Sequence, residues 1–362
     1  MQGYLEIITD YDLAQAEDLL AKAGLSLPAG RTYGLGFYED GRLAACGFLA
    51  GNVICGICVA QHAREGGLAT SILSRIVLHG RQEGVSHFFI FTKASEALKF
   101  KDSGFDLLAK TEDAGLLEQG RPSYADWLNA TRAAINGHGW KTADTDASST
   151  TATSSNEGFG AIVMNANPFT RGHEYLARTA ASACEKLLVF VVEEDVSVFP
   201  FAVRFNLVRK GLADVGNVLV LPAGPYMVSR ASFPAYFTAD AKVGSIHATL
   251  DCTIFATRIA RDLGISLRFV GTEPFDPVTA AYNAAMASVF EKHGIALQEI
   301  PRLEASAQSI SASKVRAYFK TDVSEESWQT LAKMLPPVTW DFLRSEESAT
   351  IRQKLRDHVG RH

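Results

Sequence analysis

The stretch Gly160–Val192, GAIVMNANPFTRGHEYLARTAASACEKLLVFVV, decides the fold of the second half of the chain. Its apolar run at residues 161–164 predicts a buried strand, and a second apolar run at 187–192 predicts another. Between them, apolar residues recur at the three- and four-residue spacing of a helix that faces a core. Strand, helix and strand in this order predict a βαβ unit with parallel strands.

The polar loop of this unit has the chemistry of a phosphate site. It lies where the first strand gives way to the helix, and a helix N-terminus offers free N–H groups and a partial positive charge to an anion. Gly172 has no Cβ that would keep a phosphate away from the backbone. Thr170 and His173 are three residues apart, so both side chains can face one ligand. The alternative is an ordinary turn with a histidine that is satisfied within the fold.

A second motif, ISASKVR at Ile310–Arg316, lies nearer the C-terminus. Ser311 or Ser313 can cap the helix that follows. Lys314 and Arg316 then fall in the first turn of that helix, where a cation opposes the helix dipole. A bound polyphosphate explains this placement, and the alternative is a solvated basic turn.

The two motifs resemble those of the nucleotidyltransferase superfamily. The T-x-G-H sequence at residues 170–173 is a variant of the H-x-G-H signature of that superfamily, and ISASKVR is similar to its I-S-S-T-x-x-R motif. The longer stretch MNANPFTRGHEYL looks like the form found in the citrate lyase ligase family, and FVGTEPF and SRASFPAYF also occur in the order of that family. The resemblance covers nearly the whole chain.

Segment order predicts two domains. We expect a first α/β domain at residues 1–136, a flexible linker at 137–157 and a nucleotidyltransferase-like domain at 158–362. The linker includes the run ADTDASSTTATSSNE, which has no large apolar residue and cannot bury a core. After residue 158, helix and strand patterns alternate, which predicts an α/β fold with a doubly wound parallel sheet. One of these helices is expected at Asp251–Leu263, with Gly264 ending it.

The totals exclude several classes of function. The chain has 362 residues, a formal net charge of −5 and a pI near 6.0, which argues against a general nucleic-acid binder. No segment is long and apolar enough to span a membrane, and the N-terminus lacks the pattern of a secretion signal, so we expect a cytoplasmic protein. The five cysteines are too scattered for a disulfide framework. Cys55 and Cys58 lie in an apolar run, as expected for buried core thiols.

The first half of the chain predicts a second α/β fold. Strand patterns at Tyr33–Glu39 and Leu43–Ala50 flank Asp40-Gly41, which is a strong hairpin signal. A later R-x-x-G-x-A loop between a strand and a helix resembles the acetyl-CoA loop of the GNAT acetyltransferase fold, in which backbone N–H groups hold the pyrophosphate of coenzyme A. A plain turn is the alternative. This half shows no evident catalytic acid or base, which favours binding over catalysis as its role. The loop contributes four candidate binding residues: Arg64, Gly66, Gly67 and Ala69.

Other residues are expected to position the nucleotide. Gly271, Thr272 and Glu273 directly follow a predicted strand, so their backbone should face a ligand at the carboxyl edge of the sheet, with a plain turn as the alternative. Arg204 lies near the start of a predicted helix, where it either reaches a phosphate or is a surface arginine. The loop before the T-x-G-H sequence supplies the remaining candidates: Asn165, Asn167 and Phe169.

The resemblance to the citrate lyase ligase family implies a reaction. Acetate, ATP with Mg²⁺, and the thiol of the citrate lyase acyl carrier, whose prosthetic group derives from dephospho-coenzyme A, would give the acetyl-thioester, AMP and pyrophosphate. Acetate must first become acetyl-AMP, because a free carboxylate is a poor acyl donor. Thr170 and His173 would serve the reacting phosphate, and the second motif would hold the outer phosphates through Ser311, Ser313, Lys314 and Arg316. No protein ligand to a metal is predicted.

Three alternatives remain open. A related ligase would load acetate onto another carrier, such as that of malonate decarboxylase. A cofactor adenylyltransferase would act on a phosphate in place of a carboxylate. A nucleotide-binding regulator would combine the phosphate site with an inert GNAT-like sensor.

Overall fold

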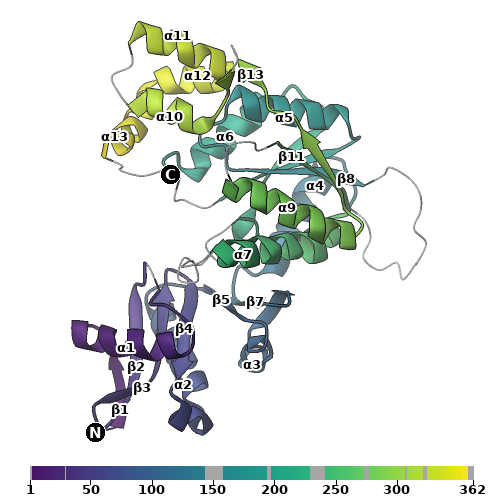
Figure 1. The fold of residues 1–362 in the computed structure, drawn as a ribbon. Helices are drawn as coiled ribbons and strands as arrows, with labels where there is room; N and C mark the ends of the chain where they lie inside the picture. Colours follow the sequence, from purple (N-terminus) through teal and green to yellow (C-terminus); the bar gives the residue numbers. More distant parts are fainter. Residues whose placement is uncertain are drawn as a thin grey trace. The chain divides into compact units, whose positions relative to one another are not determined.

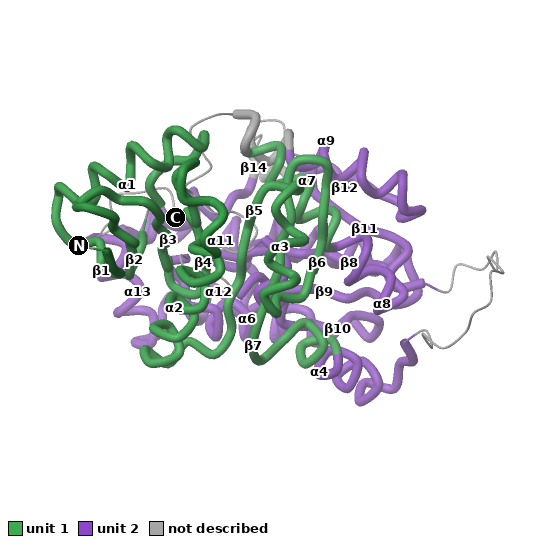
Figure 2. The backbone as a smooth tube through the Cα atoms, turned by 90° about the horizontal axis from the view of Figure 1, so that it is seen from below, with its two compact units in different colours: residues 1–128, 230–254 green, residues 129–229, 255–362 purple. Residues whose placement is uncertain are grey.

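The fold is known from a computed structural model, which describes residues 2–28, 30–142, 158–193, 197–228, 241–272, 277–305, 308–320 and 324–357. The chain divides into two compact units, coloured separately in Figure 2. Unit 1 contains residues 1–128 and 230–254, and unit 2 contains residues 129–229 and 255–362. Each unit is built around its own sheet.

The sheet of unit 1 has the strand order β1-β2-β3-β4-β5-β7-β6 (Figure 1). Every neighbouring pair is antiparallel except β4 and β5, which are parallel. The predicted hairpin is confirmed: β2 pairs with β3, and Asp40 and Gly41 both have positive φ, as a two-residue type I′ turn requires. The strands are β1 (Gln2–Glu6), β2 (Tyr33–Glu39), β3 (Arg42–Ala50), β4 (Val53–Val59), β5 (His87–Lys93), β6 (Asp106–Lys110) and β7 (Ala114–Gly120).

Helices supply apolar side chains to two core clusters of unit 1. Ile72 and Ile76 of α2 belong to one cluster, and Leu19 and Leu20 of α1 belong to the other. Cys55 and Cys58 lie in the α1 cluster, so the prediction of core thiols is confirmed, and burial raises the pKa of Cys55 to about 12. The helical elements are α1 (Asp10–Lys22), η1 (Gln61–Gly66), α2 (Leu68–Gln82), α3 (Ala97–Asp102) and the start of α4 (Tyr124–Gly137).

The sheet of unit 2 has five parallel strands in the order β10-β9-β8-β11-β12. The chain starts at the central strand, moves outward to one edge and then returns to build the other, which confirms the predicted doubly wound parallel sheet. Every residue of β9 is buried, as expected of a strand covered on both faces. The strands are β8 (Phe159–Met164), β9 (Leu187–Val191), β10 (Val218–Pro222), β11 (Ile265–Gly271) and β12 (Ala296–Ile300).

A separate core joins the C-terminal helices of unit 2. Val315 and Phe319 of α10 pack with Leu331, Leu343 and other buried residues of α11 to α13. Phe199 and Ile310 belong to the same cluster, so this core also supports two loops of the unit. Two short strands of unit 2, β13 (Glu304–Ala305) and β14 (Gln308–Ser309), pair with each other. The helices of unit 2 are α5 (Arg171–Ser182), α6 (Phe201–Gly211), η2 (Gly224–Tyr226), a π-helical turn (Phe255–Ala260), α8 (Arg261–Leu263), α9 (Pro277–Lys292), α10 (Ala312–Lys320), α11 (Glu325–Met334), α12 (Pro337–Arg344), η5 (Glu346–Ser348) and α13 (Ala349–Asp357).

The division into units differs from the predicted domain boundaries at two places. Helix α7 (Ala241–Ile254) lies within the predicted second domain, yet it packs on β6 and β7 of unit 1, and its His247 ring lies edge-on to Phe91. The helix predicted at Asp251–Leu263 begins earlier than predicted, at Ala241, and includes a π-helical turn. Gly264 ends it as predicted, with φ of 75°. The second half of α4 belongs to unit 2, where Arg132 donates to Asp262 O at 2.7 Å. Most of the predicted linker lies outside the described residues.

Within the described residues, no helix combines the length and the apolar character needed to cross a membrane.

Candidate active site

Thr170 and His173 interlock at the start of α5. Thr170 is the N-cap: its Oγ1 accepts a hydrogen bond from the His173 N–H at 3.5 Å, and the backbone N–H of Thr170 donates to Nδ1 of His173 at 3.1 Å. The Thr170 hydroxyl also lies 2.9 Å from Nδ1. These reciprocal bonds form a capping box in which a histidine takes the place usually held by an acidic or amide side chain. These bonds therefore hold the side chains of Thr170 and His173 against the N-terminus of α5.

The hydrogen bond from Thr170 N–H sets the protonation state of His173. A backbone N–H can only donate, so Nδ1 must be the acceptor and the neutral ring carries its proton on Nε2. Burial and, to a smaller extent, the positive charge of Arg302 together lower the pKa of His173 to about 4. At neutral pH, His173 is thus an uncharged hydrogen-bond donor through Nε2.

The two sequence motifs lie together, as their shared ligand would require. Arg316 donates from Nη1 to Asn167 O at 2.6 Å, which joins α10 to the loop before α5. A Cβ at Gly172 would lie 3.5 Å from Ile310 O, so the first turn of α5 passes close to the start of the serine motif. Ser311 caps α10 by accepting from the Lys314 N–H at 3.3 Å, and its hydroxyl is 3.1 Å from that of Ser313.

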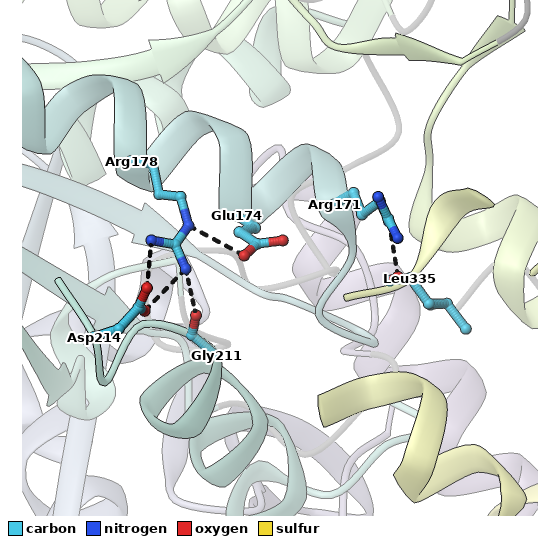
Figure 3. A network of polar contacts seen from close by, with 6 residues as sticks. All are labelled: Arg171, Glu174, Arg178, Gly211, Asp214 and Leu335. Carbon is cyan, nitrogen blue, oxygen red and sulfur yellow. Dashed lines mark hydrogen bonds and ion pairs between the residues drawn. The ribbon is translucent and has the colours of Figure 1, made fainter. Parts of the chain in front are cut away.

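A salt-bridge network fixes the direction of α5 (Figure 3). Arg178 forms two hydrogen bonds to Asp214, at 2.9 and 3.0 Å, and a third to Glu174 at 3.1 Å. In the same view, Arg171 reaches away from this group and donates from Nε to Leu335 O at 2.9 Å. These bonds tie α5 to the end of α6 and to the C-terminal helices, and so hold the capped N-terminus in place.

The loop before α5 differs in part from the prediction. Asn165 is exposed and accepts from the Ser197 hydroxyl at 3.1 Å, which leaves it near the surface of the site. Asn167 is buried, and its side-chain oxygen accepts from Phe199 N at 3.2 Å. Phe169 is fully buried, and a Cβ at Gly211 would come within 2.5 Å of its ring. Its side chain therefore belongs to the core and is not placed to contact a nucleotide.

Arg204 lies neither at a phosphate site nor on the surface. Its side chain is fully buried and donates to three backbone carbonyls, those of Phe199 at 2.9 Å, Asn165 at 2.8 Å and Val192 at 2.6 Å. Both interpretations drawn from the sequence are wrong, because position near a helix start does not show which way a side chain points.

The backbone N–H and C=O groups of Thr272, just after β11, already have hydrogen-bond partners within the protein. Thr272 N donates to Ile300 O at 3.0 Å, and Thr272 O accepts from Arg302 Nε at 2.9 Å, so neither group is directed at a ligand in the way we predicted. Gly271 has open space around its Cα, since no atom lies within 4 Å of an added Cβ. Glu273 lies outside the described residues.

Arg302 is a candidate that the sequence analysis missed. It lies two residues after the end of β12, at the carboxyl edge of the sheet, and its charge acts on His173. A basic residue close after a predicted parallel strand was the available signal. Arg302 adds a positive charge to a site that already contains Lys314, Arg316 and the N-terminus of α5.

A cavity of about 570 Å³ lies in unit 1 beside the R-x-x-G-x-A loop. Strands β4 and β5 pair only at Val53–Phe89 and Ile54–Ile90, and the cavity lies along the unpaired remainder. Apolar side chains such as Ile54, Leu73 and Ile90 line it, together with the basic residues Arg64, Lys93 and Lys99. Gly67, in the left-handed conformation with φ of 66°, and Ala69 also line it, but Gly66 does not.

The described residues contain no group of three or more His, Cys, Asp or Glu side chains that could hold a metal ion.

These observations define a two-unit α/β protein in which unit 2 has the parallel sheet of a nucleotidyltransferase-type domain and a cationic candidate site at the capped N-terminus of α5. A family model described as the citrate lyase ligase C-terminal domain matches residues 159–343. Citrate (pro-3S)-lyase ligase of Klebsiella pneumoniae is 36% identical over 308 residues, covering 83% of this chain and 84% of the relative. The Escherichia coli K12 protein of the same name is 35% identical over 332 residues, with 87% of each covered. The chain belongs to the citrate lyase ligase family.

Solved structures similar to the first third of the chain are acetyltransferases. One is a putative acetyltransferase of the GNAT family from Desulfovibrio desulfuricans, 16% identical with a TM-score of 0.30, which covers 33% of this chain and 99% of that structure. Another is the ribosomal-protein-S18-alanine N-acetyltransferase of Escherichia coli, 16% identical with a TM-score of 0.28, covering 34% of this chain and 99% of that one.

Proposed function

We propose that this protein is an ATP-dependent ligase that activates acetate as acetyl-AMP and acetylates the prosthetic-group thiol of the citrate lyase acyl carrier protein. One observation carries the phosphate chemistry: Arg316 of the serine motif bonds Asn167 O, which places that motif beside the capped N-terminus of α5. Membership of the citrate lyase ligase family supports the choice of acetate and carrier.

The residues of unit 2 fit the first half-reaction. An acetate oxygen attacks the α-phosphorus of ATP, the bond to the β-phosphate oxygen breaks, and its electron pair leaves with pyrophosphate. Negative charge grows on the α-phosphate oxygens and on the leaving group, so the site gains most from fixed donors and cations. His173 donates from Nε2 to the reacting phosphate, while Lys314, Arg316 and Arg302 hold the departing one. Mg²⁺ enters with ATP as its complex, since this ion is bound largely by substrate phosphates and water.

The second half-reaction moves the acetyl group from AMP to sulfur. The thiolate of the carrier attacks the acetyl carbonyl, the bond from that carbon to the AMP oxygen breaks, and AMP leaves. We assign the grip on the prosthetic arm to the cavity of unit 1. The apolar residues of its lining suit the pantetheine chain, and Arg64 with the Gly67 backbone suits the pyrophosphate of a dephospho-coenzyme A group.

Product analysis tests this function. The protein is incubated with Mg²⁺, ATP, acetate and citrate lyase carrier bearing a free thiol, and nucleotides are resolved by chromatography. We expect equimolar AMP, pyrophosphate and acetylated carrier. ADP with inorganic phosphate would contradict an acyl-adenylate route, and equal acetylation of an unrelated carrier, such as that of malonate decarboxylase, would contradict the stated partner.

A further inference from the structure

Arg204 is the largest fully buried side chain of the described residues, and the half-reactions above do not use it. Its Nε donates to Phe199 O, and its Nη1 donates to both Asn165 O and Val192 O. Asn165 follows β8, Val192 follows β9, and Phe199 precedes α6. One guanidinium group therefore joins three backbone segments that meet at the carboxyl edge of the parallel sheet.

Burial of the Arg204 guanidinium has an unfavourable free energy, so its presence here suggests that the geometry it fixes serves the protein. A buried positive charge loses its hydration, and an apolar side chain of similar volume packs a core without that loss. The planar guanidinium, with five N–H donors in a fixed fork, can hold several carbonyls in one plane, and the tetrahedral ammonium of a lysine cannot reproduce that pattern.

A second arginine holds the same loop at another carbonyl. Arg316 donates to Asn167 O at 2.6 Å, while Arg204 donates to Asn165 O, two residues earlier. Ala166, between them, has φ of 49°, a left-handed conformation that residues with a Cβ rarely adopt. The backbone from Asn165 to Asn167 is thus held at both ends in a conformation it would not keep on its own.

We propose that Arg204 is a positioning residue for the nucleotide, and this inference rests on the function proposed above. It fixes the backbone of Asn165–Asn167, and through it the direction in which Thr170 and His173 enter α5, without touching the ligand itself. Binding and turnover of ATP depend on this loop geometry, since a misplacement of about 1 Å in a site can lower the rate by about 100-fold.

The test compares three variants of the full chain. Arg204→Lys keeps the charge but cannot serve all three carbonyls. Ala166→Gly leaves Arg204 in place and only loosens the backbone between the two held carbonyls. Arg132→Lys is the matched control, because Arg132 of α4 also holds a backbone carbonyl, Asp262 O at 2.7 Å, but Asp262 precedes β11 and so lies at the amino edge of the sheet, opposite the loop. For each variant we would measure thermal unfolding, the Kd of Mg·ATP by calorimetry, and kcat and KM for acetate-dependent exchange of labelled pyrophosphate into ATP.

We expect Arg204→Lys, at a temperature where it is folded, to bind Mg·ATP about 10-fold more weakly and to lower kcat by about 10- to 100-fold. Ala166→Gly should change both values in the same direction, and Arg132→Lys should change only the unfolding temperature. A folded Arg204→Lys protein with wild-type Kd and kcat would overturn the inference. If Arg204→Lys does not fold, unchanged Kd and kcat in Ala166→Gly would overturn it instead. Wild-type protein that binds Mg·ATP but shows no acetate-dependent exchange would contradict the proposed function only, and the ratio of Kd values would still decide the role of Arg204.

Discussion

At the scale of single residues, His173 shows how a backbone hydrogen bond selects a chemical role. Because Thr170 N–H occupies Nδ1, the ring offers Nε2–H as a neutral donor. The lowered pKa keeps it neutral across the range in which ATP chemistry is usually measured. A neutral donor stabilises a phosphate oxygen without giving up a proton, which is what an adenylate-forming step requires.

The lowered pKa of His173 predicts a pH dependence of stability. Its pKa is about 4 in the folded protein and near the ordinary 6.5 in the unfolded chain, so between these values the unfolded state binds more protons. The contribution of neutral His173 is complete above about pH 6.5 and is lost as pH falls toward 4. The unfolding temperature of wild type relative to His173→Gln should therefore decrease over that interval. Parallel curves for the two proteins from pH 7.5 to 4.5 would contradict the assigned pKa.

The sequence predicted the position of the two motifs better than the direction of single side chains. Thr170 and His173 do lie at the N-terminus of α5, and Ser311 does cap α10, because the spacing of residue types at a helix start is visible in sequence. Phe169 and Arg204 were misread, since a side chain in a loop or in the first turn of a helix can point to ligand or to core and only the packing decides. Phe169 fills space against Gly211, and Arg204 is drawn inward by three carbonyls.

At the scale of elements, the N-cap residue of α10 is expected to contribute both to the stability of the fold and to the affinity for ATP. Ser311 accepts from Lys314 N–H, so Ser311→Ala should cost about 1 kcal/mol of unfolding free energy, as other N-cap deletions do. It should also weaken ATP binding, because its hydroxyl lies in the proposed phosphate site.

The matched control for Ser311→Ala is Ser324→Ala. Ser324 caps α11 in the same way, accepting from Ser327 N–H at 3.2 Å. It should lose a similar amount of stability in denaturant titrations and leave the Kd of ATP unchanged. Equal effects of the two variants on ATP affinity would remove Ser311 from the site.

Strands and most helices were predictable because their apolar spacing reflects burial on a known face. The hairpin at Asp40-Gly41 needs two residues of positive φ, and the sequence supplies residue types that tolerate it. Helix α7 was not predictable in its placement, because a buried helix shows which residues are apolar but not which sheet covers them.

At the scale of the whole molecule, α7 makes the two halves of the sequence interdependent. Residues 158–362 made alone would contain α7 without β5, β6 and β7, the strands against which it lies in unit 1. We expect this fragment to bind a hydrophobic dye and to unfold at lower temperature than the full chain. A monomeric fragment with full-chain stability and no dye binding would contradict the division into units.

The cavity of unit 1 makes a prediction about the carrier. Gly67 has left-handed backbone, and an added side chain would meet open space, so Gly67→Asn and Gly67→Asp should both fold. Only aspartate adds a negative charge beside the proposed pyrophosphate site. Gly67→Asp should slow acetyl transfer to the carrier about 10-fold or more relative to Gly67→Asn, a typical effect of one charge–charge contact at a partly buried site. Both should retain acetate-dependent pyrophosphate exchange, and equal transfer rates would show that the arm binds elsewhere.

Formation of acetyl-AMP by unit 2 is tested most directly by pyrophosphate exchange, because the exchange needs no carrier. Wild-type protein with Mg²⁺, ATP and labelled pyrophosphate should place label in ATP only when acetate is added. His173→Ala should lower that rate by about 100-fold or more, the usual scale for removing one transition-state donor. Exchange that proceeds equally without acetate, or a His173→Ala protein with wild-type rate, would contradict the account.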